Sequence, residues 1–277
     1  MRAGVPMQVK PTILPRKADG ELDRLSCLIS RFRVEVAAVK PDKIYIEPTN
    51  FFVFEDDAGR LRVIFCPQAV NTPGIKSVCT KHISGTVLMA AHVEVSGAGQ
   101  HVLTAMPEEI MVPLDEAPEL AVVVMPIVDE VRTPRCGGRA VLHRLFEVFM
   151  IRLLRYVVQT QGTTVGLLAG LAHPRLSVAL VSIHEAPDRQ WGLEDLADVA
   201  GMSRTQFAVT FKDVVGMTPG AYLSNWRLEV ARAELASGAA IKSVAKICGF
   251  SSTASFSRAF SRRFGHAPKY ARESVGA

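Results

Sequence analysis

Two copies of one pattern lie about 48 residues apart in the C-terminal third of the chain, and they constrain its fold more than any other feature. In each copy an apolar residue, Leu193 or Ile241, is followed by Ala four residues later and by Gly eight residues later. Glycine permits the left-handed turn that ends a helix, and a small Ala lets a second helix approach closely. A Ser after the turn can cap the next helix, whose phenylalanines, spaced by four, face the core. The pattern predicts two helix-turn-helix units in an all-α region.

The segment between the two units predicts one long helix that holds them apart. It starts at Thr218-Pro219, where Pro suits the first helical turn, and it closes at Ser237-Gly238. A helix of roughly 16 residues spans about 24 Å. Such a helix can hold the second helix of each unit against successive major grooves, about 34 Å apart on one face of DNA.

The net charge of +5 is unevenly distributed along the chain. Residues 1–172 contain 19 basic and 18 acidic side chains, whereas residues 173–277 contain 13 basic and 9 acidic ones. Most of the basic excess therefore lies on the helix-turn-helix region. An anionic partner such as DNA is expected there.

The first part of the chain has a different character. Short β-branched or aromatic runs separated by turn formers occupy residues 28–131, among them Phe51–Phe54, Leu61–Phe65 and Leu120–Met125. Many short strands at regular spacing predict a small β-sandwich or barrel.

Residues 139–159 predict a helix that is apolar nearly all round, and such a helix must be covered on more than one side. A second subunit would cover it and make the chain a homodimer through this helix. Burial against its own β domain is the alternative. With residues 161–173 as a linker, we expect an α+β chain with a regulatory and dimerising domain at 1–172 and a helical domain at 173–277.

The helical domain resembles the DNA-binding domain of AraC/XylS-type transcriptional regulators over about residues 174–272. The residues that carry the resemblance include Gly201-Met202-Ser203, Gly216-Met217-Thr218-Pro219, Trp226-Arg227-Leu228, Phe256-Ser257-Arg258-Ala259-Phe260 and Phe264-Gly265-His266-Ala267-Pro268. Residues 1–172 resemble the cupin-type regulatory domains of that family more loosely, which implies a cupin-like barrel. The resemblance implies a bacterial cytoplasmic regulator that binds promoter DNA sequence-specifically and is controlled by a small-molecule effector. It also implies an activator that contacts RNA polymerase, rather than an enzyme.

The outward positions of the two second helices are the candidate DNA contacts. They are Arg204, Thr205, Gln206 and Lys212 in the first unit, and Thr253, Ser255, Arg258 and Arg262 in the second. Arg258 is the best candidate for a guanine contact, with Arg262 and Arg263 on the backbone. Arg227 resembles a backbone contact of the family. The family usually has long polar side chains where this chain has Ala208 and Val209, so base reading falls mainly to the second unit.

The segment Glu94-Val95-Ser96-Gly97-Ala98-Gly99 resembles half of the signature with which PilZ-type domains bind cyclic di-GMP. A carboxylate can accept from the guanine N1 and N2 hydrogens, and glycines let the backbone approach the nucleotide. Glu94, Ser96, Gly97 and Gly99 are therefore the candidate effector residues, and cyclic di-GMP is the candidate effector. The other half of the signature, two arginines spaced RxxxR, is absent, and an ordinary glycine-rich hairpin turn is the alternative.

Other forms of control stay open. Oxidation of a cysteine (at position 27, 66 or 79) or a different metabolite could gate the regulator, and a metal-dependent cupin enzyme fused to a DNA-binding domain is the alternative of another class. The histidines at 82, 92 and 101 include no HxH pair, so we expect no metal cofactor. The five cysteines lack CxxC spacing and predict reduced thiols, not a disulfide framework. No stretch suits a membrane helix or a signal peptide, so we expect no membrane partner.

Overall fold

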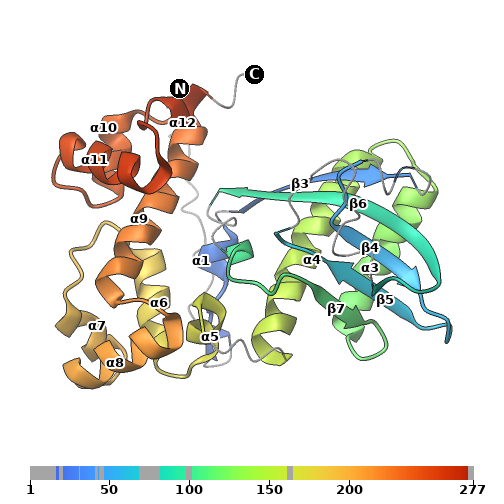
Figure 1. The fold of residues 1–277 in the computed structure, drawn as a ribbon, viewed down its shortest axis with the longest axis horizontal. Helices are drawn as coiled ribbons and strands as arrows, with labels where there is room; N and C mark the ends of the chain where they lie inside the picture. The colour runs from blue at the N-terminus through green and yellow to red at the C-terminus, as the bar shows by residue number, and fades with distance from the viewer. Residues whose placement is uncertain are drawn as a thin grey trace, which may run out of the picture.

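A computed structural model describes residues 17–18, 21–30, 32–40, 43, 47–68, 82–97, 102–160 and 165–273 (Figure 1). Figure 1 shows a sheet with its covering helices at one end of the molecule and a group of helices, from the C-terminal part of the chain, at the other. The expected α+β fold class is confirmed, with a β-rich N-terminal part and an all-α C-terminal part.

The N-terminal part is built on a five-stranded antiparallel sheet with the order β3-β6-β4-β5-β7. The strands are β3 (Phe32–Val39), β4 (Phe51–Glu55), β5 (Leu61–Phe65), β6 (Thr86–Gly97) and β7 (Ile110–Pro113). The short strands β1 (Lys17–Ala18) and β2 (Glu21–Leu22) pair separately, and α1 (Ser26–Ile29) follows them. The predicted runs at 51–54 and 61–65 form the β4–β5 hairpin. Its turn is closed by Asp56, whose carboxylate accepts from the backbone of Ala58 and Arg60.

Two long helices, α3 (Pro118–Arg132) and α4 (Gly138–Thr160), cover one face of the sheet. Phe51 of β4 packs edge-on against Phe146 and Phe149 of α4, with ring centroids 5.0 and 5.1 Å apart. The apolar helix expected at 139–159 therefore buries one side against its own β domain. Val141 and Val148 on its other side stay 42% and 41% exposed.

The strand expected at Leu120–Met125 was wrong, because this run lies in α3. Pro118 occupies the first helical turn, where its missing N–H costs nothing. Leu120, Val123 and Val124, spaced by three and four, point into the core with less than 6% exposure, so packing against α4 and the sheet overrides the β-propensity of the valines.

The C-terminal part is helical from residue 167 onward. It contains α5 (Leu167–Ala172), α6 (Leu176–Glu185), α7 (Leu193–Val199), α8 (Arg204–Val215), α9 (Pro219–Ala236), α10 (Ile241–Ile247), α11 (Thr253–Phe264) and α12 (Tyr270–Glu273). Figure 1 shows α9 running between the pair α7–α8 and the pair α10–α11. The long linking helix expected between the two units is thus present, with 18 residues. No helix among the described residues is long and apolar enough to cross a membrane.

The short helix α5 connects the two parts of the molecule. The N–H of Gly166 donates to the carbonyl of Val214 in α8 over 2.8 Å. A side chain at Gly170 would meet Leu180 at 2.7 Å and Val215 at 2.9 Å, so glycine here allows α5 to lie directly on the first unit. Arg24, which precedes α1, donates to the carbonyl of Leu171 over 3.0 Å. The N-terminal part and the first helix-turn-helix unit therefore both contact α5.

Candidate DNA interface

The first unit folds as its sequence signals indicate. Ser203 caps α8 by accepting from the N–H of Gln206 over 3.3 Å, and Gly216 ends the helix with a φ of 81°. Phe207 and Phe211, both fully buried, pack with ring centroids 5.5 Å apart. These contacts bury one face of α8 and leave the opposite face in solvent.

The second unit repeats this arrangement. Ser252 and Ser255 form a capping box at the start of α11, in which each serine hydroxyl bonds to the backbone of the other residue. Phe256 and Phe260 are fully buried with ring centroids 5.6 Å apart, and Gly265 ends the helix with a φ of 77°. The outward face of α11 is therefore fixed by two rings buried in the core and by a cap.

Most of the candidate DNA contacts lie on these exposed faces. The exposed members are Arg204, Thr205, Gln206 and Lys212 on α8, and Thr253, Arg258 and Arg262 on α11. Ser255 is half-buried, and its hydroxyl donates to the carbonyl of Ser252 over 2.8 Å, so it serves the helix cap. Val209 on α8 is 55% exposed, which leaves an apolar patch in the middle of the first surface.

Arg227 does not lie on these surfaces. Its Nε donates to the carbonyl of Pro187 over 2.6 Å, and its Nη2 donates to the carbonyl of Arg189 over 2.9 Å. Burial lowers the pKa of Arg227 below its ordinary value. The guanidinium is therefore engaged inside the domain, and its contact with a DNA phosphate stays a prediction.

Sequence reasoning missed a buried carboxylate that holds α11. Glu229 of α9 is 4% exposed, and its two oxygens lie 3.3 Å from Nη2 of Arg263 and 2.9 Å from Nη2 of Arg232. Arg263, which the sequence placed on the DNA backbone, thus joins the end of α11 to α9. The signal in the sequence was an acidic residue among the apolar positions of the linking helix, which indicates a buried carboxylate with a basic partner.

The candidate effector residues lie at the end of β6. Glu94 and Ser96 share one side of the strand, where the residues opposite them on β3 are Glu35 and Arg33. Glu94, Glu35 and Arg33 are exposed. Gly97 still pairs with β3, so the expected turn does not begin before residue 98. Gly99 lies outside the described residues.

A cavity of about 330 Å³ lies beside the β4–β5 turn. Asp56, Arg60, Arg62 and His82 are among the residues that line it. Asp56 Oδ2 accepts from Arg62 Nε over 2.6 Å, and His82 Nδ1 lies 2.8 Å from the carboxylate of Glu109. Within the described residues no group of three His, Cys, Asp or Glu side chains could hold a metal ion.

The expectation of reduced thiols throughout the chain was wrong for Cys66, which is disulfide-bonded. Its side chain lies directly after β5 and is 1% exposed. Cys27, Cys136 and Cys248 are thiols. The sequence reasoning relied on CxxC spacing, which Cys66 does not have.

Comparison with known proteins places this arrangement among known regulators. A helix-turn-helix domain model matches residues 196–274, and a cupin model matches residues 26–159. The chain is 34% identical over 176 residues to a protein of Streptomyces lividans described as an AraC-like transcription regulator, covering 62% of this chain and 58% of that protein. It therefore spans less than two thirds of that relative's length.

A second relative is the RCS-specific HTH-type transcriptional activator RclR of Escherichia coli K12, 31% identical over 196 residues, with 69% of each chain covered. Among solved structures, an AraC-type transcriptional regulator from Chromobacterium violaceum is similar to 37% of this chain and to 93% of its own length. That match has 29% identity and a TM-score of 0.36.

Proposed function

This chain belongs to the AraC-type transcriptional regulators, and from this premise we propose that it binds promoter DNA with α8 and α11 and activates transcription. The observation that carries the proposal is the pair of capped helices, joined by α9, whose exposed faces display Arg204, Lys212, Arg258 and Arg262. Activation implies a contact with RNA polymerase, and action on a promoter implies a cytoplasmic location. The relative RclR is named as an activator, which supports the sign of the regulation. We propose that the chain acts as a regulator and not as an enzyme.

Selection of DNA from a random library by the full chain tests this function. We expect a two-part site with an affinity that falls steeply as salt rises, because cations that neutralise phosphates release counterions. Footprinting should show two protected half-sites on one face of the duplex, one helical turn apart. Failure to enrich any sequence, or enrichment of a single half-site only, would contradict the proposal. Transcription in vitro with RNA polymerase from the selected site distinguishes activation from repression.

We propose that a small-molecule effector controls DNA binding, with cyclic di-GMP at the end of β6 as the specific candidate. Glu94 and Ser96 supply the guanine-binding groups of the motif, and Arg33, directly opposite Ser96, adds an exposed cation for a phosphate. Titration calorimetry with cyclic di-GMP tests the assignment. We expect binding by the full chain, loss in Glu94→Gln and Arg33→Ala, and retention in Arg60→Ala. Absence of both heat and thermal stabilisation would end the assignment.

A second candidate for control is oxidation and reduction of a cysteine, because Cys66 is disulfide-bonded. DNA binding by the full chain should be compared with and without a thiol reductant. If this candidate is right, the reductant changes the affinity of the wild type and of Cys136→Ser, an exposed control, but not that of Cys66→Ser. An equal response of all three chains would contradict it.

We propose that the regulator is a homodimer through an apolar stripe on α3 and α4. Val122 and Met125 of α3 are 67% and 45% exposed, and Val148 of α4 is 41% exposed. Arg152, one turn after Val148 in α4, donates to the backbone carbonyl of Glu119, one turn before Val122 in α3, so the two helices contact each other beside these valines. Apolar side chains gathered on one surface are typical of subunit contacts, and a two-fold axis would pair the stripe with itself.

A further inference from the structure

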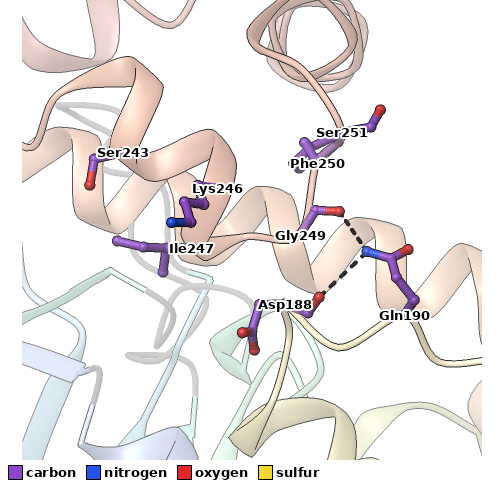
Figure 2. A pocket seen from close by; sticks show the side chains of 8 residues that line it. All are labelled: Asp188, Gln190, Ser243, Lys246, Ile247, Gly249, Phe250 and Ser251. Atoms are coloured by element: carbon purple, nitrogen blue, oxygen red, sulfur yellow. Dashed lines mark hydrogen bonds between the residues drawn. The ribbon is translucent and has the colours of Figure 1, made fainter.

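The loop at residues 186–191, between α6 and α7, lies against the turn of the second helix-turn-helix unit. Figure 2 shows Gln190 reaching from this loop to Gly249, the turn glycine between α10 and α11. Gln190 Nε2 donates to the carbonyl of Gly249 over 3.0 Å and lies 3.4 Å from the carbonyl of Asp188. A segment that leads into the first unit is thereby bonded to the second unit.

Arg227 completes this contact from α9. Its hydrogen bonds to the carbonyls of Pro187 and Arg189 hold the loop on both sides of Asp188, the residue that faces Gly249. A Cβ built on Gly249 would lie 2.8 Å from the carbonyl oxygen of Asp188 and 2.9 Å from Nη2 of Arg227, and the φ of this residue is 72°. Glycine is therefore required here both for its backbone conformation and for the close approach of loop and guanidinium.

The contact depends on these few groups. Beside them lies a cavity of about 590 Å³, whose lining includes Asp188, Ser243, Lys246 and Ile247 (Figure 2). The cavity separates part of the loop from α10, and the hydrogen bonds of Gln190 to Gly249 and of Arg227 to the loop join the loop to its neighbours beside it. A planar guanidinium with donors in a fixed fork suits two carbonyls in different directions better than an ammonium does.

We infer that Arg227 and Gln190 form a clasp that sets the angle between the two helix-turn-helix units, and thereby the spacing of the two half-sites that the chain accepts. The helix α9 fixes the distance between the units, and each unit packs on it, α11 through the ion pair of Arg263 with Glu229 and α8 through the contact of Phe211 with Tyr222. A second connection through the loop at 186–191 restrains the angle between the units further. One base pair of altered spacing moves a half-site by about 3.4 Å and rotates it by about 35°, so a fixed angle excludes it. Arg227 is thus a positioning residue rather than a DNA contact.

The test rests on the proposed DNA binding and uses the full chain with the DNA that it selects. Affinity is measured for the selected site and for versions with one base pair inserted or removed between the half-sites. We expect Arg227→Gln and Gln190→Ala each to reduce the preference for native spacing by about fivefold, the scale of one net hydrogen bond. The salt dependence of binding should stay unchanged. Gln190 is exposed, so its variant tests the clasp even if Arg227→Gln fails to fold.

Arg258→Ala is the matched control, because a lost base contact lowers the affinity for every spacing by the same factor. If Arg227→Gln lowers all affinities equally and reduces the salt slope by about one phosphate, Arg227 is a backbone contact and the clasp is overturned. Unchanged spacing preference in both clasp variants also overturns it. A wild-type chain that selects no DNA contradicts the proposed function instead.

Discussion

We expect specific base reading by the second unit to depend most on the side chain of Arg258. It is exposed on α11, on the side of the helix away from the fully buried rings of Phe256 and Phe260. Arg262 lies one turn further along the same outward face. An arginine fork can bond to both acceptors of a guanine edge, whereas an alanine cannot. We expect Arg258→Ala to weaken binding to the selected site by about 1–3 kcal/mol and to relax the preference at one base pair. Competition binding against sites substituted at single positions measures both, and an equal loss on every sequence would make Arg258 a phosphate contact.

Asp56 gives the β4–β5 turn a stability that depends on pH. The hydrogen bond from Arg62, together with backbone hydrogen bonds from Arg60 and Ala58, lowers the pKa of the Asp56 carboxyl to about 2. A carboxyl whose pKa is depressed in the folded state stabilises the fold above its unfolded pKa of about 3.9, and this stabilisation is lost as the pH falls towards about 2. Asp56→Asn should therefore melt at a lower temperature than the wild type at pH 7. Thermal unfolding followed from pH 7 to pH 2.5 should show the difference narrowing below about pH 4; a constant difference would mean that the charge is not involved.

At the scale of elements, the orientation of α11 depends on a carboxylate of α9. Glu229 is almost fully buried and faces Arg232 and Arg263, while Arg232 also lies over the ring of Phe264. Removing the charge leaves both guanidinium groups without their shared partner, and hydrogen bonds to charged groups contribute about 1.5–3 kcal/mol. We expect Glu229→Gln to lower the free energy of unfolding by about 1–3 kcal/mol and to weaken DNA binding further at the half-site read by α11. Glu116→Gln, at an exposed loop position, is the control for denaturant unfolding. A loss of stability without any change in binding at that half-site would show that Glu229 contributes to folding but not to the orientation of α11.

The elements that sequence reasoning placed correctly are those with local signals. A Ser or Thr cap, a Gly at the end and apolar spacing predict helices α8, α9 and α11, and these signals lie within or next to each helix in the sequence. The errors arise where contacts with a segment far away in the sequence determine the local structure. The valines of α3 resemble a strand until α4 and the sheet cover them, and Gly97 resembles a turn until β3 pairs with it. The intradomain hydrogen bonds of Arg227 were likewise out of reach of local signals, because its partners, the carbonyls of the loop at 186–191, lie about 40 residues away in the sequence.

Across the whole molecule, α5 is one of the elements through which a change in the N-terminal part would reach the DNA-binding part, beside the contacts of β6 with α9 and of α1 with α6. Arg24 holds its C-terminal end from the N-terminal side, and Gly170 seats it between α6 and the end of α8. The first unit is thus tied to the N-terminal part, while the clasp at Arg227 ties the second unit to the first. A signal that shifts α5 would move both units together, so it should act on the position of the whole domain rather than on one half-site.

The proposed homodimer concerns the whole molecule, because it would hold two DNA-binding domains at a fixed distance on one promoter. The stripe of Val122, Met125 and Val148 is exposed on helices whose opposite sides are buried against the sheet, so a charge there should not disturb the fold. We expect Val122→Lys with Val148→Lys to convert the dimer to a monomer, since each copy would meet the other's lysines across the two-fold axis. Sedimentation velocity measures the assembly, and binding to a single two-part site should survive in the monomer. Val209→Lys, an equally exposed valine on α8, is the control that should leave the assembly unchanged. A double-lysine chain that still sediments as a dimer would show that another surface joins the subunits.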